Sequence, residues 1–143
     1  MFRKLTDTVY ASPQITLDDV AAARDLGVTL IVNNRPEGES DDQTAGTEIE
    51  GAARAAGIDY VAIPVTHAGF SQSQVDAMSA ALERASGPVL AYCRSGTRST
   101  LLWALARAKH GDNPDALAEQ AASAGYDVTP VRPLMDMLAS GGA

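Results

Sequence analysis

The residues best suited to chemistry surround Cys93, the only cysteine among 143 residues. It follows the apolar run of residues 89–92 and precedes the polar segment RSGTRS. A thiolate is a strong nucleophile, and the positive charges of Arg94 and Arg98 favour ionisation of the thiol. Gly96 permits a tight backbone turn that aims several N–H groups inward at an anion. The spacing therefore predicts a covalent nucleophile beside an oxyanion site.

Two regular elements are expected to position this cysteine. Gly87-Pro88 leads into residues 89–92, whose unbroken apolar character is typical of a central parallel strand. Residues 99–109 are expected to form a helix, because apolar side chains recur there at helical spacing. In open α/β sheets, ligands bind at the carboxyl ends of the strands, and a helix amino terminus attracts anions. The strand, loop and helix together predict an anion site around Cys93.

The other side chains of the loop suit such a site. Arg98 offers a planar fork to an oxyanion. The hydroxyl groups of Ser95, Thr97 and Ser99 are expected to bond the sulfur or the anion. The alternative is that Cys93 is a small buried core residue, which is the usual role of an isolated cysteine. Its place between an apolar run and RSGTRS favours the nucleophile.

The loop resembles the anion cradles of rhodanese sulfurtransferases and of cysteine-dependent phosphatases. Four residues separate Cys93 from Arg98, whereas tyrosine and dual-specificity phosphatases place five there. Tyr92 stands where those phosphatases usually carry histidine, so both features are similar to single-domain rhodaneses. Over nearly the whole chain, including VNNRPEGE and YCRSGTRS, the sequence most resembles the phosphatase-like domain of the beta-lactamase hydrolase-like protein family. That domain can stand alone or be fused to a persulfide dioxygenase, which implies sulfur metabolism.

The order of the predicted helices and strands distinguishes the resemblance to rhodaneses from the resemblance to phosphatases. Strands are expected over residues 9–11, 28–32, 60–65 and 89–92, and helices over residues 16–26, 44–56, 71–86, 99–109, 113–124 and 132–139. This alternation predicts crossover units of a parallel sheet. Two helices after the active-site helix resemble the dual-specificity phosphatase fold, because a rhodanese returns there to short extended segments. We therefore expect one α/β domain over residues 1–143, with a parallel sheet flanked by helices as in dual-specificity and tyrosine phosphatases.

Residues after two other strands are further candidates. His67 lies where dual-specificity phosphatases carry an aspartic general acid, so the resemblance suggests an acid or base, with an ordinary loop histidine as the alternative. Arg35 and Asn34 either face the same site or shape a turn. Asp41 and Asp42 could supply an acid only if their loop folds inward. No metal site is expected, because the metal-binding residue types do not cluster, and no cofactor is expected.

The composition narrows the choice of partners. A net charge of −7 disfavours nucleic acid and anionic membranes. The segment MFRKLTDTVY lacks the apolar core of a signal peptide, and no stretch is apolar enough to span a bilayer. A lone cysteine cannot form an intramolecular disulfide, which fits the reducing cytoplasm where we expect the protein.

These observations favour an enzyme that uses Cys93 as a covalent nucleophile. The preferred reaction is transfer of sulfane sulfur from thiosulfate or a persulfide, through a Cys93 persulfide, to a thiol or cyanide. This reaction needs one cysteine and no aspartic acid. The alternative is hydrolysis of phosphate monoesters through a phospho-cysteine, and a second is a non-catalytic binding module. The expected partners are a small anionic sulfur or phosphate substrate and, from the resemblance, a persulfide dioxygenase or a thiol acceptor.

Overall fold

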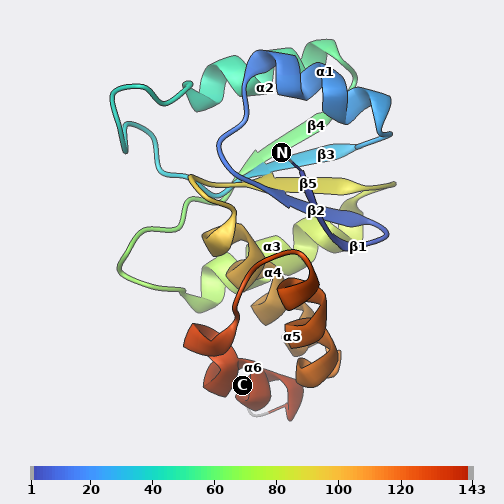
Figure 1. Ribbon diagram of the computed structural model, residues 1–143, viewed down its shortest axis with the longest axis vertical. Helices are drawn as coiled ribbons and strands as arrows, with labels where there is room; N and C mark the ends of the chain where they lie inside the picture. The colour runs from blue at the N-terminus through green and yellow to red at the C-terminus, as the bar shows by residue number, and fades with distance from the viewer. Residues whose placement is uncertain (1, 142–143) are drawn as a thin grey trace.

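The computed structural model describes residues 2–141 and contains one five-stranded sheet through the middle of the molecule (Figure 1). The strands are β1 (Arg3–Thr6), β2 (Val9–Ser12), β3 (Leu30–Asn33), β4 (Asp59–Ala62) and β5 (Val89–Tyr92). Their spatial order is β1-β2-β5-β3-β4. All neighbours pair in parallel except β1 and β2, which are antiparallel. The expected α/β class with a parallel sheet is confirmed, and the sheet has one additional antiparallel edge.

The sequence analysis misses that edge strand. Of the four residues of β1, only Leu5 is buried, while Arg3 and Lys4 are exposed. Such a segment has neither the alternation nor the apolar run by which strands are recognised. Charged side chains are nevertheless common on edge strands, where they discourage pairing with other chains. The strand is held by its pairing with β2 rather than by its own pattern.

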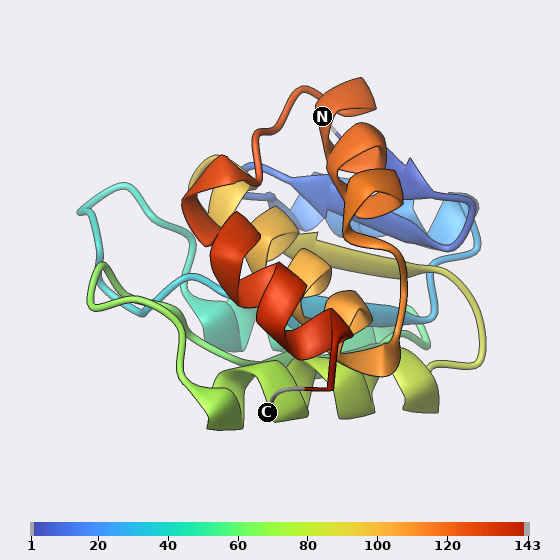
Figure 2. The ribbon, with the colours of Figure 1, turned by 90° about the horizontal axis from the view of Figure 1, so that it is seen from below.

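Helices cover both faces of the sheet. On one face lie α1 (Leu17–Asp25) and α2 (Gly46–Ala55), at the top of Figure 1. On the other lie α3 (Gln72–Arg84), α4 (Thr97–His110), α5 (Pro114–Ser123) and α6 (Arg132–Ala139), with a short 3-10 turn, η1 (Thr129–Val131), before α6. Figure 2 views the molecule from the side of these four helices. The expected helices are all present, and their ends differ from the predicted ones by a few residues.

Capping side chains explain where α1, α3 and α5 begin. The side chain of Thr16 accepts a hydrogen bond from the backbone of Asp19, whose carboxylate bonds back to the Thr16 N–H. Ser71 and Gln74 form the same reciprocal arrangement at the start of α3. Asn113 caps α5 directly before a proline. Each cap satisfies N–H groups that have no partner within the helix.

The central strand β5 separates two cores. Val89 and Ala91 pack with α4 and its neighbours, whereas Leu90 and Tyr92 pack with α1 and α2. This alternation follows from the two-residue period of a strand. Helix α4 is buried along most of its length, including Trp103. Trp103 and Tyr92 are among the largest fully buried side chains of these two cores. None of the helices among the described residues is long and apolar enough to cross a membrane.

Candidate active site

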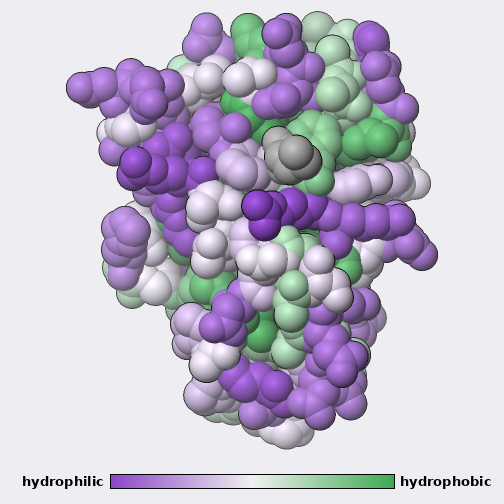
Figure 3. Space-filling model, in the orientation of Figure 1, coloured by the Kyte–Doolittle hydropathy of each residue, from purple (hydrophilic) through white to green (hydrophobic). Residues whose placement is uncertain are grey.

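The loops that follow β3, β4 and β5 emerge at the same end of the sheet, on the left in Figure 1. This happens because β3 lies between the other two strands and all three run parallel. The loops carry most of the candidate residues. The same side of the surface is mainly hydrophilic in Figure 3.

Cys93 follows β5 directly and is fully buried. Its Sγ accepts a hydrogen bond of 3.1 Å from the backbone N–H of Gly96. Gly96 has a φ of 93° and precedes the first residue of α4, so a residue without a β-carbon suits the position. The sulfur thus lies at the amino terminus of a long helix and receives a backbone donor. Both features favour the thiolate, which is the nucleophilic form.

The guanidinium of Arg98 is held in a defined orientation. Its Nη1 donates to Glu39 Oε2 at 2.6 Å and to the Val65 carbonyl at 2.7 Å, and its Nη2 donates to Glu39 Oε1 at 2.9 Å. These bonds leave the Nε–H and one Nη2–H without a hydrogen bond to any residue in the range 2–141. The two hydrogens lie on one edge of the guanidinium, where they match two oxygens of an oxyanion. The hydrogen bonds that Arg98 donates to Glu39 raise the pKa of Arg98, and Cys93 adds a smaller contribution in the same direction.

Glu39 is a site residue that the sequence analysis misses. Besides its two bonds to Arg98, its Oε1 accepts a hydrogen bond of 2.9 Å from Arg35 Nε. The hydrogen bond from Arg98, aided by Arg35, lowers the pKa of Glu39 to about 2. Glu39 is therefore a carboxylate at neutral pH and cannot supply a proton to a leaving group. Its position in the polar segment NNRPEGE, after a strand end, is the only sequence signal for it.

Arg35 lies close to Arg98, and each of its three side-chain nitrogens donates a hydrogen bond to a protein group. Its side chain is buried and donates to Glu39, to Gln14 Oε1 at 3.0 Å and to Ser40 Oγ at 3.0 Å. Arg35 is thus linked to Arg98 through the shared Glu39 Oε1. Arg35 contributes positive charge and holds the loop after β3, whereas Arg98 presents its Nε–H and Nη2–H edge to an anion.

Asn34 and Ser99 tie three elements together beneath the loop. Ser99 Oγ donates to Asn34 Oδ1 at 2.8 Å, and Asn34 Nδ2 donates to the Ile63 carbonyl at 2.9 Å. The expectation that the Ser99 hydroxyl bonds the sulfur or an anion is therefore corrected, because this hydroxyl is buried and bonded to Asn34. Asn33 bonds the Arg35 N–H and Tyr60, so it shapes the turn after β3.

The remaining loop residues lie at the solvent side. Ser95 Oγ donates to Thr97 Oγ1 at 3.0 Å and accepts from the Thr97 N–H at 3.3 Å. The side chain of Arg94 is exposed and has no hydrogen bond or ion pair with residues 2–141. These residues lie on the exposed side of the loop, whereas the Gly96 N–H bonds the buried sulfur.

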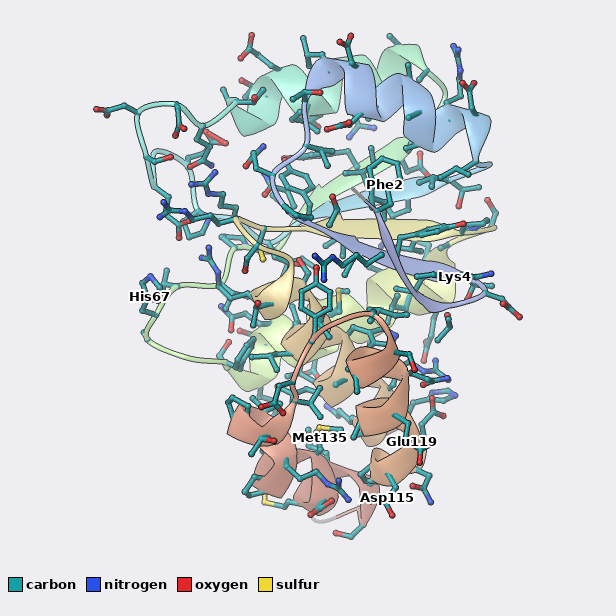
Figure 4. All side chains as sticks on the ribbon, in the orientation of Figure 1. Phe2, Lys4, His67, Asp115, Glu119 and Met135 are labelled. Atoms are coloured by element: carbon teal, nitrogen blue, oxygen red, sulfur yellow. The ribbon has the colours of Figure 1, made fainter. Side chains whose placement is uncertain are left out.

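The candidate acids are not brought to Cys93. His67 lies on an exposed turn of the loop between β4 and α3 and points away from the body of the molecule (Figure 4). Asp41 and Asp42 are exposed, and a hydrogen bond from Ser40 lowers the pKa of Asp42. Their loop does not fold inward. Within residues 2–141, no group of three or more potential ligands could hold a metal ion.

Comparison with known proteins places these features in a family. Residues 1–110 match the family described as the phosphatase-like domain of beta-lactamase hydrolase-like protein. A beta-lactamase hydrolase-like protein of Agrobacterium fabrum is 36% identical over 104 residues, which are 73% of this chain and 24% of that protein. A similar protein of Xylella fastidiosa is 31% identical over 75% of this chain. The chain thus spans about a quarter of the length of these relatives.

Solved structures agree on the fold. A crystal structure of a "putative phosphatase" from Neisseria meningitidis has a TM-score of 0.83 and 34% identity, covering 95% of this chain and 96% of that one. The P. aeruginosa protein TpbA, solved with phosphotyrosine, has a TM-score of 0.68 over 98% of this chain and 88% of its own. At 20% identity, TpbA shows only that the fold is shared. This chain belongs to the family of phosphatase-like domains of beta-lactamase hydrolase-like proteins.

Proposed function

We propose that the domain is a cysteine-dependent phosphatase that hydrolyses phosphate monoesters through a phospho-cysteine at Cys93. The observation that carries this proposal is the pairing of a buried sulfur, which accepts the Gly96 N–H, with an Arg98 guanidinium whose Nε/Nη2 edge is free. The phosphatase-like family and the relative from Neisseria meningitidis support it. This reverses the preference for sulfur transfer drawn from the sequence, which rested on the loop length and on the absence of an aspartic general acid.

The proposed reaction has two displacement steps. The Cys93 thiolate attacks phosphorus, and the bond to the ester oxygen breaks with its electron pair remaining on that oxygen. Arg98 holds two phosphoryl oxygens through Nε–H and Nη2–H, while loop N–H groups face the third. Water then attacks the phospho-cysteine, loses a proton to solvent, and releases inorganic phosphate and the thiolate.

The ionised state of Glu39 predicts which phosphate esters are the better substrates. It is the carboxyl group closest to Arg98, but it is ionised and bonded to two arginines, so it does not protonate a leaving group. Loss of general acid catalysis costs about 10²–10⁴-fold when the leaving group is a poor one. Aryl phosphates, whose leaving phenolate is much less basic than an alkoxide, should therefore be better substrates than alkyl phosphates. Phosphotyrosine, the aryl phosphate held by TpbA, is a suitable probe.

Sulfane-sulfur transfer is the second candidate, favoured by the same missing acid and by the four residues between Cys93 and Arg98. Sulfite leaves thiosulfate as a weakly basic anion and needs no proton. In this case a thiol would accept the sulfur, and a persulfide dioxygenase would be a fitting partner.

One preparation should be assayed in parallel with p-nitrophenyl phosphate and with thiosulfate plus cyanide, and Cys93→Ser is the control. The proposal expects a higher kcat/KM for the aryl phosphate and a trapped phosphoryl adduct on Cys93. Faster thiocyanate formation, with a mass gain of one sulfur atom on Cys93, would establish the sulfurtransferase instead. If neither activity depends on Cys93, the domain is a binding module.

A further inference from the structure

A tyrosine from the carboxyl-terminal helical segment contacts the nucleophile loop. Tyr126 follows α5 and lies outside the residues that match the family, which end at residue 110. Its hydroxyl donates a hydrogen bond of 3.1 Å to the Ser95 carbonyl. The same hydroxyl lies against Gly96, where any β-carbon would overlap it. Only 8% of Tyr126 is exposed, so this contact is an internal one.

The bonded carbonyl belongs to the peptide group that serves the sulfur. Ser95 C=O and Gly96 N–H form one peptide, and no cis bond occurs among residues 2–141. In a trans peptide these two groups point in opposite directions. On one edge of the peptide the Ser95 carbonyl therefore accepts from the Tyr126 hydroxyl, and on the opposite edge the Gly96 N–H donates to Cys93 Sγ at 3.1 Å. Bonds linked in this way polarise one another.

This peptide needs an external contact to select its orientation. Glycine adopts positive and negative φ almost equally well, so rotation of the Ser95–Gly96 peptide is not opposed at Gly96, whose φ is 93°. A rotated peptide would turn its carbonyl toward the thiolate and remove the N–H. We propose that Tyr126 is a positioning residue that holds this peptide with its N–H directed at Cys93. The proposal rests on Cys93 being the nucleophile, as above.

Tyr126 is itself well anchored as a donor. The guanidinium of Arg3 lies over its ring, 5.3 Å from the centroid, and Arg3 Nη1 donates to the Ala124 carbonyl at 3.1 Å. The Tyr126 N–H bonds the Ala121 carbonyl at 2.9 Å. Burial raises the pKa of Tyr126, and Cys93 adds to this, whereas Arg3 opposes it, so the hydroxyl keeps its proton. Arg3 of strand β1 and Ala121 of helix α5 thus both hold Tyr126 in its place against the loop.

Tyr126→Phe removes only the hydroxyl, and Tyr10→Phe is the matched control, because the Tyr10 hydroxyl has no hydrogen bond to residues 2–141. Ionisation of Cys93 is followed by thiolate absorbance at about 240 nm against pH, with each variant measured against its own Cys93→Ser background. This readout needs no substrate, so it stands whether or not phosphate esters are hydrolysed.

Tyr126→Phe should raise the midpoint of thiolate formation by about one pH unit, the equivalent of a weakened hydrogen bond to a charged group. Where an aryl phosphate is turned over, kcat/KM at low pH should fall about tenfold and recover as pH rises. Tyr10→Phe should leave the midpoint unchanged. An unchanged midpoint in folded Tyr126→Phe, or an equal shift in both variants, would overturn the proposal.

Discussion

Replacing Glu39 with glutamine tests the charge arrangement of the site most directly. Glutamine has the shape of glutamate but lacks its charge. Its one amide oxygen can keep the bonds from Arg98 Nη2 and Arg35 Nε, but its amide N–H₂ group then stands where Oε2 accepts from Arg98 Nη1. Arg98 and Arg35 are both largely buried, with 15% and 3% of their side chains exposed. Two cations would then face each other across a neutral group. We expect the variant to be less stable than the native protein at neutral pH.

The size of the effect follows from the ionisation of Glu39. Its pKa falls from 4.5 to about 2, chiefly through the hydrogen bond from Arg98. A shift of this size corresponds to about 3 kcal/mol in favour of the carboxylate. Solvent reaches part of this pair, since 18% of the Glu39 side chain is exposed, and screening leaves about 1–2 kcal/mol. The native protein should lose this stability as pH falls from about 4.5 towards 2, because the unfolded chain binds the proton first.

Urea unfolding of the native protein and Glu39→Gln at several pH values between 3 and 7 measures this difference. The gap in unfolding free energy should be about 1–2 kcal/mol at pH 7 and less than half of that near pH 3. The matched control is Glu50→Gln, which breaks an exposed pair with Arg54 and should cost less than about 0.5 kcal/mol at any pH. A gap that does not change with pH, or equal gaps for both variants, would refute the reasoning.

Three other substitutions or labelling experiments test the remaining site residues. Arg98→Lys should lower kcat/KM about 10–100-fold, because a point charge cannot replace the planar fork, and native-like kinetics would instead implicate Arg94 or Arg35. Iodoacetamide at neutral pH should alkylate the native protein at Cys93 and abolish its turnover, and an unreactive Cys93 would remove the argument for a nucleophile. His67→Ala should change kcat/KM less than about twofold, because the side chain points to solvent; a larger loss would show that its loop closes over the substrate.

Local sequence signals were sufficient for most of the fold. Proline, glycine and capping residues mark the ends of the helices, and α6 occupies the residues predicted for it, Arg132–Ala139. The apolar run before Cys93 is the central strand, as expected. Strand β4 stops at Ala62, and the proline at position 64 is a residue that disfavours a regular strand through residue 65. Strand β1 was not predicted, because it is stabilised by pairing with β2 and its four residues carry no pattern that reveals this pairing.

The site was predictable only where its residues are contiguous. Cys93, Gly96 and Arg98 share one loop, so their spacing alone reveals a sulfur, a backbone donor and a guanidinium. Glu39 and Tyr126 reach that loop from separate parts of the chain, and neither stands in a recognisable motif. Their roles depend on which hydrogen of a guanidinium, or which side of a peptide, is already occupied. That information exists only once the chain has folded.

Contacts from four residues outside the loop fix its geometry. Glu39 and the Val65 carbonyl orient Arg98, Asn34 holds the first turn of α4 through Ser99, and Tyr126 bonds the Ser95 carbonyl. A site whose donors are held before the substrate arrives spends little free energy on reorganisation when charge develops in the transition state. The number of residues between Cys93 and Arg98 is therefore a weaker guide to the reaction than the donors these contacts leave free. Since the free edge of Arg98 matches two oxygens and no protonated acid adjoins it, leaving-group basicity should govern the rate more strongly than the rest of the substrate.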